Sequence, residues 1–427
     1  MVKVEKIKHV KGSAKIPGDK SITHRAFIFS SISHGESYIK NPNMGLDTER
    51  TLKIMSEVGA RISVENGEVK VSGVGLKDIK EPDNVLDAGN SGTTTRLLCG
   101  LFSSVNNKTF FLTGDDSLRR RPMKRVIEPI TLMGGFIIGR DNGKYLPLAI
   151  VGKELRGITY NMEIPSAQVK SAIMLATLNA NSQSTIYEKL KTRDHTEIML
   201  KEFGGKIEVY GNKITVYPVE KLYGRKIFIP GDFSSAAYLI AIAMLLEDSE
   251  LILKDVSLNP TRTYLIDVFR RSGGNIEIIN KRKVNGENVG DILVKSSILS
   301  KIEITKDEAP LLIDELPLIG AIGPLVKGGV HVVGATELRV KESDRIKLIV
   351  DNLKNIGVEA YEYKDGFIVK EGTVKGGIIK TAFDHRIGLS FAVLGSVCKG
   401  DLYIEEIDSI KVSFPEFFEI LRSVSYG

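Results

Sequence analysis

The most regular feature of the chain is a polar segment that leads directly into an apolar run of helical length. Successive copies start 71, 76, 66, 82 and 70 residues apart. Because Asp, Asn and Ser cap helix N-termini, each copy predicts a helix whose first turn is polar and whose remainder is buried. The six copies are Asp19-Lys20-Ser21, Asn90-Ser91-Gly92-Thr93, Ser166-Ala167-Gln168, Asp232-Phe233-Ser234-Ser235, Asp314-Glu315-Leu316 and Asp384-His385-Arg386.

A second pattern follows five of these segments: an amphipathic helix, a Gly, and two short alternating runs separated by a turn. Residues 59–71 and 204–216 are clear examples, and the others begin at Gly134, Gly273 and Gly357. The Gly predicts a helix C-terminus, and Asn-Gly or Gly-Asn predicts the hairpin turn. The chain is therefore predicted to be α/β (α+β), with six repeated βαβ-type units of helices and mixed sheets.

The sixth copy has helices but no hairpin, and the N-terminal residues 2–16 read as the missing strands. We therefore expect two similar three-repeat domains, one discontinuous (1–18 plus 232–427) and one continuous (19–231). Ile16-Pro17-Gly18-Asp19 recurs at Ile229-Pro230-Gly231-Asp232, which predicts hinges near 16–20 and 229–232. The six helix N-termini are then expected to face a ligand cleft between the domains. A solenoid is the alternative, but its terminal repeats would be polar caps.

The composition says more about the class of ligand than about the fold. The 427 residues are 42% hydrophobic with a net charge of +6, and the cations are dispersed, which favours small anionic ligands over nucleic acid. The only cysteines are Cys99 and Cys398, both in apolar runs, as expected for reduced thiols in the cytoplasm. We expect neither a signal peptide nor a membrane span, and we expect a monomer.

Common cofactor and nucleophile motifs are absent from the sequence. It has no P-loop spacing, no G-x-G-x-x-G opening a helix, no His pair with metal-ligand spacing and no G-x-S-x-G. The predicted helix starts instead carry cations and hydroxyls, and arginine suits carboxylate and phosphate recognition. Singly, each of these residues is as well explained by capping or a surface ion pair. Acid–base chemistry would fall to Asp314, Glu342, Lys20, Lys341 or His385, and Asp314 could equally be a plain N-cap.

Several of these motifs together resemble the 3-phosphoshikimate 1-carboxyvinyltransferase (EPSP synthase) family. They are Gly18-Asp19-Lys20-Ser21 with Arg25, Asn90 to Arg96, Arg121-Pro122, Ser166-Ala167-Gln168, Arg339 to Arg345, and Asp384-His385-Arg386. The resemblance spans nearly the whole chain and implies two three-repeat domains around a cleft. It implies transfer of the enolpyruvyl group of phosphoenolpyruvate to the 5-hydroxyl of shikimate 3-phosphate, with release of phosphate. It implies no metal, no organic cofactor, and no nucleic-acid or membrane partner.

The resemblance also implies roles for individual residues. Asp314 is the expected base for the 5-hydroxyl, Glu342 the acid for the methylene carbon, and Lys20 a catalytic cation. The shikimate 3-phosphate ligands implied are Lys20, Ser21, Arg25, Ser166, Ala167, Gln168, Thr192, Asp314 and Lys341. The phosphoenolpyruvate ligands implied are Lys20, Asn90, Gly92, Arg121, Gln168, Arg345, His385 and Arg386.

Three departures from the family pattern matter. Ala167 stands where members often carry a second Ser, so one phosphate hydroxyl is missing. The stretch from Thr192 to Glu197 resembles one that differs between branches of the family, so Arg193 could substitute as a phosphate ligand. Lys411 is displaced by one residue from a C-terminal motif, so no role is assigned to it.

Two alternatives remain. An enolpyruvyl transferase acting on UDP-N-acetylglucosamine would share the architecture, but the loop 114–122 lacks the reactive Cys typical of that family. A non-catalytic repeat protein that binds a partner in its cleft is the other.

Overall fold

The computed structural model describes residues 1–426, which fall into two compact units. Unit 1 contains residues 1–17, 230–283 and the chain from 288 onward, and unit 2 contains residues 18–229 and 284–287. Each unit has three sheets and its own core of buried apolar side chains. The mixed α/β prediction is confirmed. No helix within residues 1–426 is both long and apolar enough to cross a membrane.

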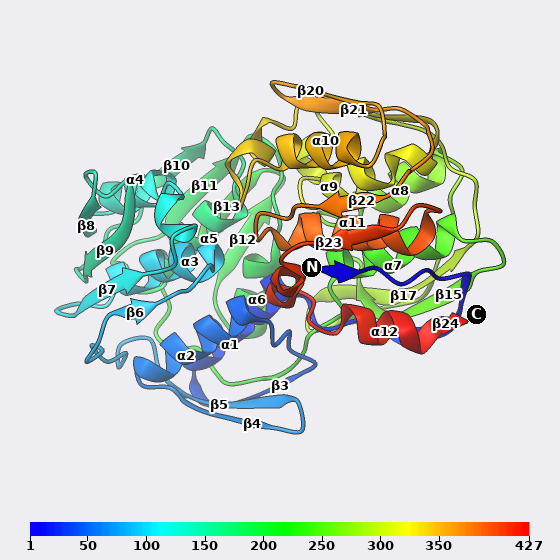
Figure 1. Ribbon diagram of the computed structural model, residues 1–427. Coiled ribbons are helices and arrows are strands. Elements are labelled where there is room, and N and C mark those ends of the chain that lie inside the picture. The colour runs from blue at the N-terminus through cyan, green and yellow to red at the C-terminus, as the bar shows by residue number, and fades with distance from the viewer. Residues whose placement is uncertain (427) are drawn as a thin grey trace. The chain divides into compact units, whose positions relative to one another are not determined.

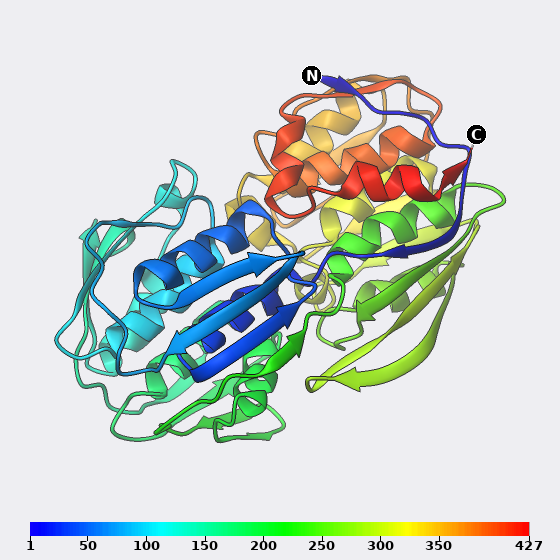
Figure 2. The ribbon, with the colours of Figure 1, turned by 90° about the horizontal axis from the view of Figure 1, so that it is seen from below.

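The elements of unit 2 are labelled in Figure 1. Its helices are α1 (Lys20–Ser31), α2 (Leu46–Glu57), α3 (Gly92–Ser103), α4 (Lys124–Leu132), α5 (Ala167–Thr177) and α6 (His195–Glu202). Its strands are β3 (His34–Lys40), β4 (Arg61–Glu65), β5 (Glu68–Val74), β6 (Leu86–Asp87), β7 (Thr109–Thr113), β8 (Phe136–Arg140), β9 (Tyr145–Val151), β10 (Thr159–Met162), β11 (Ser184–Glu188), β12 (Ile207–Tyr210), β13 (Lys213–Val216) and β14 (Lys226–Phe228). They form the sheets β14-β3-β5-β4, β6-β7-β9-β8 and β10-β11-β13-β12. Figure 2 shows β3, β4 and β5 side by side, in blue.

The described part of unit 1 has the same number of α-helices as unit 2. They are α7 (Phe233–Leu245), α8 (Tyr264–Arg271), α9 (Leu316–Ile322), α10 (Arg345–Asn355), α11 (His385–Val397) and α12 (Phe417–Val424). Its strands are β1 (Val2–Lys3), β2 (His9–Lys15), β15 (Glu250–Ser257), β16 (Asn275–Val284), β17 (Glu287–Lys295), β18 (Ser300–Ile304), β19 (Lys327–Val332), β20 (Ala360–Tyr363), β21 (Gly366–Val369), β22 (Gly377–Ile379), β23 (Leu402–Ile404) and β24 (Ser425–Tyr426). The sheets are β16-β17-β15-β2-β24, β18-β19-β21-β20 and β1-β23-β22.

All six sheets share one pattern, in which a parallel pair of strands is extended by an antiparallel neighbour. The parallel pairs are β14–β3, β6–β7, β10–β11, β2–β15, β18–β19 and β22–β23. The N-terminal strand β1 supplies the antiparallel neighbour of β23. Both views show the N-terminal segment beside α12, within unit 1 (Figures 1 and 2). The arrangement in two units of three sheets differs from the single stack of a solenoid.

Two of the six parallel pairs exchange strands: the strand before each of two helices pairs in a different sheet from the strand after that helix. Both exchanges occur where the chain passes from one unit to the other. In the other four sheets a helix connects the two parallel strands directly, as α3 connects β6 to β7. By contrast, β2 precedes α1 in the chain but pairs with β15, and β14 precedes α7 but pairs with β3. The repeated Ile-Pro-Gly-Asp segments are these two connections. Gly is required at Gly18 because a β-carbon there would lie 1.9 Å from the carbonyl oxygen of Asn41.

A further connection was not predicted from the sequence. The tip of the β16–β17 hairpin, residues 284–287, groups with unit 2 although both of its strands run in unit 1. The side chain of Asn285 accepts from the backbone N–H of Phe228 at 2.9 Å and donates to the carbonyl of Lys226 at 3.1 Å. The hairpin tip therefore extends the β14 edge of unit 2.

The helices that follow the six polar segments are the central helices of the two cores. Five predicted caps form, with side-chain oxygens of Asp19, Ser91, Ser166, Asp232 and Asp384 accepting from backbone N–H groups one turn into the helix. The sixth differs: α9 begins at Leu316, its N-cap is Glu315, and no side-chain cap bond forms. Pro317 in its first turn lacks an N–H, so one fewer donor needs a cap. Asp314 is therefore not the cap of this helix.

Candidate active site

The sequence-predicted site residues form two groups, one in each unit, and most lie at the N-terminal ends of the central helices. In unit 2 these ends belong to α1, α3 and α5. In unit 1 they belong to α9 and α11, together with the segment before α10. Helix N-termini carry unsatisfied N–H groups and a partial positive charge, so both groups are suited to anions.

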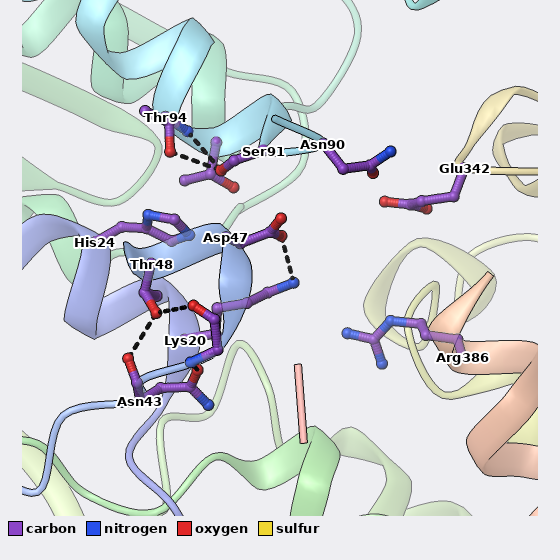
Figure 3. Close-up of polar contacts among 12 residues, drawn as sticks. Lys20, His24, Asn43, Asp47, Thr48, Asn90, Ser91, Thr94, Glu342 and Arg386 are labelled. Carbon is purple, nitrogen blue, oxygen red and sulfur yellow. Dashed lines mark hydrogen bonds and ion pairs between the residues drawn. The ribbon is translucent and has the colours of Figure 1, made fainter. Parts of the chain in front are cut away.

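Lys20 opens α1 and is held by a carboxylate of the same unit. Its ammonium lies 3.1 Å from Oδ2 of Asp47 on α2, and both side chains are largely buried (Figure 3). The turn before α2 is itself fixed, because the hydroxyl of Thr48 donates to the carbonyl of Asn43 at 2.6 Å. Asp47 thus presents Lys20 in a defined position, a role that nothing in the sequence indicated.

Arg25 lies one turn further along α1 and is buried, with 3% of its surface exposed. Its Nε donates to the hydroxyl of Thr196 at 2.6 Å, Nη2 to the hydroxyl of Ser171 at 2.9 Å, and Nη1 to the carbonyl of Ser21 at 2.8 Å. Burial lowers the pKa of Arg25 to about 10, which still leaves it charged at neutral pH. Arg193 is close enough to add to this lowering.

The N-terminus of α3 brings Asn90, Gly92 and Arg121 together. Nη2 of Arg121 donates to Oδ1 of Asn90 at 2.5 Å, and Nη1 donates to its carbonyl at 3.2 Å. A β-carbon at Gly92 would lie 2.9 Å from Nη1 of Arg96 and 3.5 Å from Nη1 of Arg121. Gly92 therefore lets two guanidinium groups approach the helix end closely.

The N-terminus of α5 carries Ser166, Ala167 and Gln168. Gln168 donates to the hydroxyl of Thr93 at 2.9 Å and accepts from Nη1 of Arg96 at 2.7 Å, which ties α5 to α3. The hydroxyl oxygen of Ser166 accepts from Val169 N at 3.4 Å, so its proton is still able to bond outward. Arg96, inside a motif noted above, is a site cation that received no role from the sequence.

Thr192 is placed differently from a simple phosphate ligand. Its hydroxyl donates to Oε1 of Glu188, and its backbone N–H donates to the same oxygen at 3.0 Å. The hydroxyl proton is thus used inside unit 2. Lys411 forms a surface pair with Asp408 at 2.6 Å and is 61% exposed.

In unit 1, Arg345 is the most enclosed cation, with 1% of its surface exposed. Its Nε lies 2.8 Å from Oδ2 of Asp384, and its Nη2 lies 2.5 Å from Oε2 of Glu342. Burial alone would lower the pKa of Arg345, but Asp384 and Glu342 raise it above its usual value. Asp384 also accepts from the hydroxyl of Ser343 at 2.8 Å. Glu342 is therefore fixed by a cation that is itself locked in place.

Asp314 and Arg386 form the second carboxylate–arginine pair of unit 1. Nη1 of Arg386 donates to the carbonyl of Asp314 at 2.7 Å, and Nε lies 3.4 Å from Oδ1. Burial acts to lower the pKa of Arg386, but Asp314 and Tyr238 raise it overall. Burial lowers the pKa of Lys341, while Asp314 and Glu342 act in the opposite direction. His385 is buried beside Arg386 at the start of α11.

The chain matches the family model described as EPSP synthase (3-phosphoshikimate 1-carboxyvinyltransferase) over residues 4–421. It belongs to this family. A protein from Thermoanaerobacter sp. (strain X514) named 3-phosphoshikimate 1-carboxyvinyltransferase is 44% identical, with 98% of each chain covered. One of the same name from Persephonella marina is 44% identical over 99% of this chain and 98% of its own.

Solved structures agree with the family assignment. An EPSP synthase from Acinetobacter baumannii has a TM-score of 0.88 at 37% identity and covers 99% of this chain and 98% of its own. The enolpyruvyl transferase NikO from Streptomyces tendae, at 12% identity and a TM-score of 0.77, shares the fold. The prediction of the EPSP synthase family is confirmed.

One polar cluster of this EPSP synthase family member was missed by the sequence reasoning. Glu315, next to Asp314, is buried and accepts from the hydroxyl of Ser234. Arg262 donates to the same hydroxyl at 2.7 Å and lies 3.3 Å from Asp232. Burial, with the neighbouring charge of Asp314, raises the pKa of Glu315. Only the pairing of Asp314 with Glu315 was visible in the sequence, and it does not reveal which of the two is enclosed.

Proposed function

We propose that the chain transfers the enolpyruvyl group of phosphoenolpyruvate to the 5-hydroxyl of shikimate 3-phosphate, giving 5-enolpyruvylshikimate 3-phosphate and phosphate. The observation that carries this proposal is the pair of carboxylate–arginine contacts in unit 1. Asp314 and Glu342 each lie against a largely buried arginine, and the charges of both act on the pKa of Lys341. Two carboxylates and three cations supply two proton-transfer groups and the charge needed by a phosphate ester.

The proton steps are assigned to the two carboxylates. Asp314 accepts the proton of the 5-hydroxyl while that oxygen bonds to C2 of phosphoenolpyruvate, and Glu342 places a proton on the methylene carbon C3. In the second step C3 loses a proton, the C2–C3 double bond re-forms and phosphate leaves with the electron pair of the C–O bond. Positioned acids and bases act in this way when they lie within hydrogen-bonding reach of the substrate.

Shikimate 3-phosphate is assigned mainly to unit 2. We propose that Ser21 and Arg25 bind the ring hydroxyls and carboxylate, and that Ser166, the N–H of Ala167 and Gln168 bind the 3-phosphate. Lys20, Asp314 and Lys341 complete the set. Because Glu188 uses the hydroxyl proton of Thr192, a direct role for Thr192 would require that bond to exchange. The adjacent Arg193 fits the phosphate better by charge.

Phosphoenolpyruvate is assigned to the more tightly held cations. We propose that Lys20, Arg121, Arg345 and Arg386 bind its phosphate and carboxylate. Asn90, Gly92, Gln168 and His385 would line the remaining surface. Lys20 is assigned a catalytic part, because a cation near the departing phosphate stabilises the charge that develops there.

We further propose that the chain works as a cytoplasmic monomer, with no nucleic-acid partner and no metal or organic cofactor. Cys99 and Cys398 are both unpaired and buried, and the positive charges of the sequence are dispersed.

Phosphate release from phosphoenolpyruvate tests the function directly. The purified chain is assayed with shikimate 3-phosphate and, separately, with UDP-N-acetylglucosamine. We expect release only with shikimate 3-phosphate. Release only with the sugar nucleotide would refute the substrate, and release with neither would favour a binding protein.

A further inference from the structure

Unit 2 contains a fully buried ion cluster that the proposed reaction does not use. Nζ of Lys170, on α5, lies 2.6 Å from Oε1 of Glu197 and 3.1 Å from Oε1 of Glu188. The exposed fractions of these side chains are 0%, 6% and 2%. Burying three charges costs free energy, and apolar replacements of such clusters are often equally stable. A role in stability alone is therefore a weak explanation for it.

The cluster fixes the segment between β11 and α6 by its backbone. Oε1 of Glu188 accepts from both the N–H and the hydroxyl of Thr192. Lys170 itself lies 3.5 Å from the carbonyl of Thr192. Glu197 closes the cluster from the first turn of α6. Both peptide groups that flank Thr192 are thus bound to the ion cluster.

The rest of the segment is bonded to other elements of unit 2. Thr196 accepts from Arg25 of α1 at 2.6 Å and lies 2.6 Å from the hydroxyl of Ser171 of α5. Nδ1 of His195 lies 2.7 Å from Glu287 at the hairpin tip. Residues 192–197 therefore join α5, the helix capped by Ser166, to α1, the helix that carries Arg25.

Charge also connects the cluster to Arg25. One lysine faces two glutamates, and the charge of Glu197 acts against the lowering of the pKa of Arg25 by burial. Lys170 stands one helical turn after Ser166 and Ala167. It therefore connects, through Glu197 and Glu188, the two places to which shikimate 3-phosphate was assigned.

We propose that Lys170 is a positioning residue for shikimate 3-phosphate: through Glu188 and Glu197 it holds residues 192–197 and Arg25 in the arrangement that binds this substrate. Lys170 does not touch the substrate. The inference rests on the proposed function, because it assigns the held segment to one of the two substrates of that reaction.

The test compares Lys170→Met with wild type and with Lys201→Met, a matched control at an exposed lysine of α6. KM is measured for each substrate separately, and amide hydrogen exchange is followed in the unliganded proteins. Displacing binding groups by about 1 Å costs up to about 100-fold. We expect KM for shikimate 3-phosphate to rise about 10- to 100-fold, with KM for phosphoenolpyruvate within about threefold. We also expect faster exchange confined to residues 189–197, and no change for Lys201→Met.

Glu188→Gln is the second variant, for use if Lys170→Met does not fold. It removes one charge of the cluster at nearly constant side-chain volume. The same selective rise in KM is expected for it. Equal rises in KM for both substrates would overturn this inference but not the proposed function. An unchanged KM for shikimate 3-phosphate in a variant that turns over would do the same. Failure of the wild-type protein to release phosphate would instead overturn the proposed function, and with it the substrate named here.

Discussion

Replacing Asp314 by Asn removes the proposed base with little change in shape. Asp314 precedes the N-cap of α9, so no helix cap is lost. The backbone contact from Arg386 at 2.7 Å is retained, and the change is in the charge of the carboxylate, which lies 3.4 Å from Nε of Arg386. A positioned base contributes about 10²- to 10⁴-fold in rate. This corresponds to roughly 3–5 kcal/mol of activation free energy.

Stability is expected to respond much less than turnover. The side chains of Asp314 and Arg386 are 15% and 11% exposed, so the pair is mostly enclosed. Removing its negative charge is expected to cost about 1–3 kcal/mol in the free energy of unfolding. Glu315 and Asp232 continue to stabilise the charge of Arg386. The variant is therefore expected to stay folded and to bind both substrates.

The assay is phosphate release at saturating substrates, with urea unfolding measured in parallel. Asp351→Asn is the control, because Asp351 forms an exposed pair with Lys347 at 2.9 Å. Such a pair contributes only about 0–1 kcal/mol, and the control is expected to keep its full turnover. Near-normal turnover by Asp314→Asn would show that the base lies elsewhere.

Three further predictions follow from the same geometry. Glu342→Gln is expected to suppress exchange of solvent deuterium into the methylene group of phosphoenolpyruvate, measured by NMR; undiminished exchange would remove Glu342 as the acid. Arg25→Ala is expected to weaken shikimate 3-phosphate binding by about 1.5–3 kcal/mol. Calorimetry showing equal weakening for phosphoenolpyruvate would reassign Arg25. Burial, with Lys20 and Arg25, holds the pKa of His24 well below 6.5, so its contribution to stability is present above pH 6.5 and is lost as the pH falls below that value. His24→Asn is therefore expected to lose less stability than wild type between pH 6.5 and 5 in urea titrations, and equal losses would contradict this.

The capped helices were predictable because capping is local chemistry. Five polar segments placed an Asp or Ser at the residue that caps the helix. The exception is α9, which starts later, at Leu316. Pro317 in its first turn has no backbone N–H, so one fewer donor requires a cap. The strand exchange was not predictable in the same way. Whether β2 pairs with β15 depends on contacts between residues more than 200 positions apart, and strand pairing leaves no short-range signal.

The site cations were recognisable from motifs, and so were the carboxylates Asp314, Glu342 and Asp384, but other carboxylates that hold cations were not. Asp47, Glu188 and Glu197 all lie in ordinary polar sequence, and an acidic residue there reads as a solvated surface position. Only the fold shows that each is enclosed against a cation. Burial of a charge is a tertiary property, so sequence reasoning could not identify these three carboxylates as supports.

In the proposed reaction, these supports keep the positively charged side chains of each unit in place before a substrate binds. Arg345 is held by Asp384, Arg386 by Asp314 and Lys20 by Asp47. Under this proposal each cation is fixed before an anion arrives, so binding would cost less side-chain entropy, and the field at the reacting phosphate would need little reorganisation. The same carboxylates limit how tightly a ground-state anion is bound, because part of each cation's charge is already balanced. Charge that develops only in the transition state then gains most from the arrangement, which is the condition for catalysis rather than storage of the substrates.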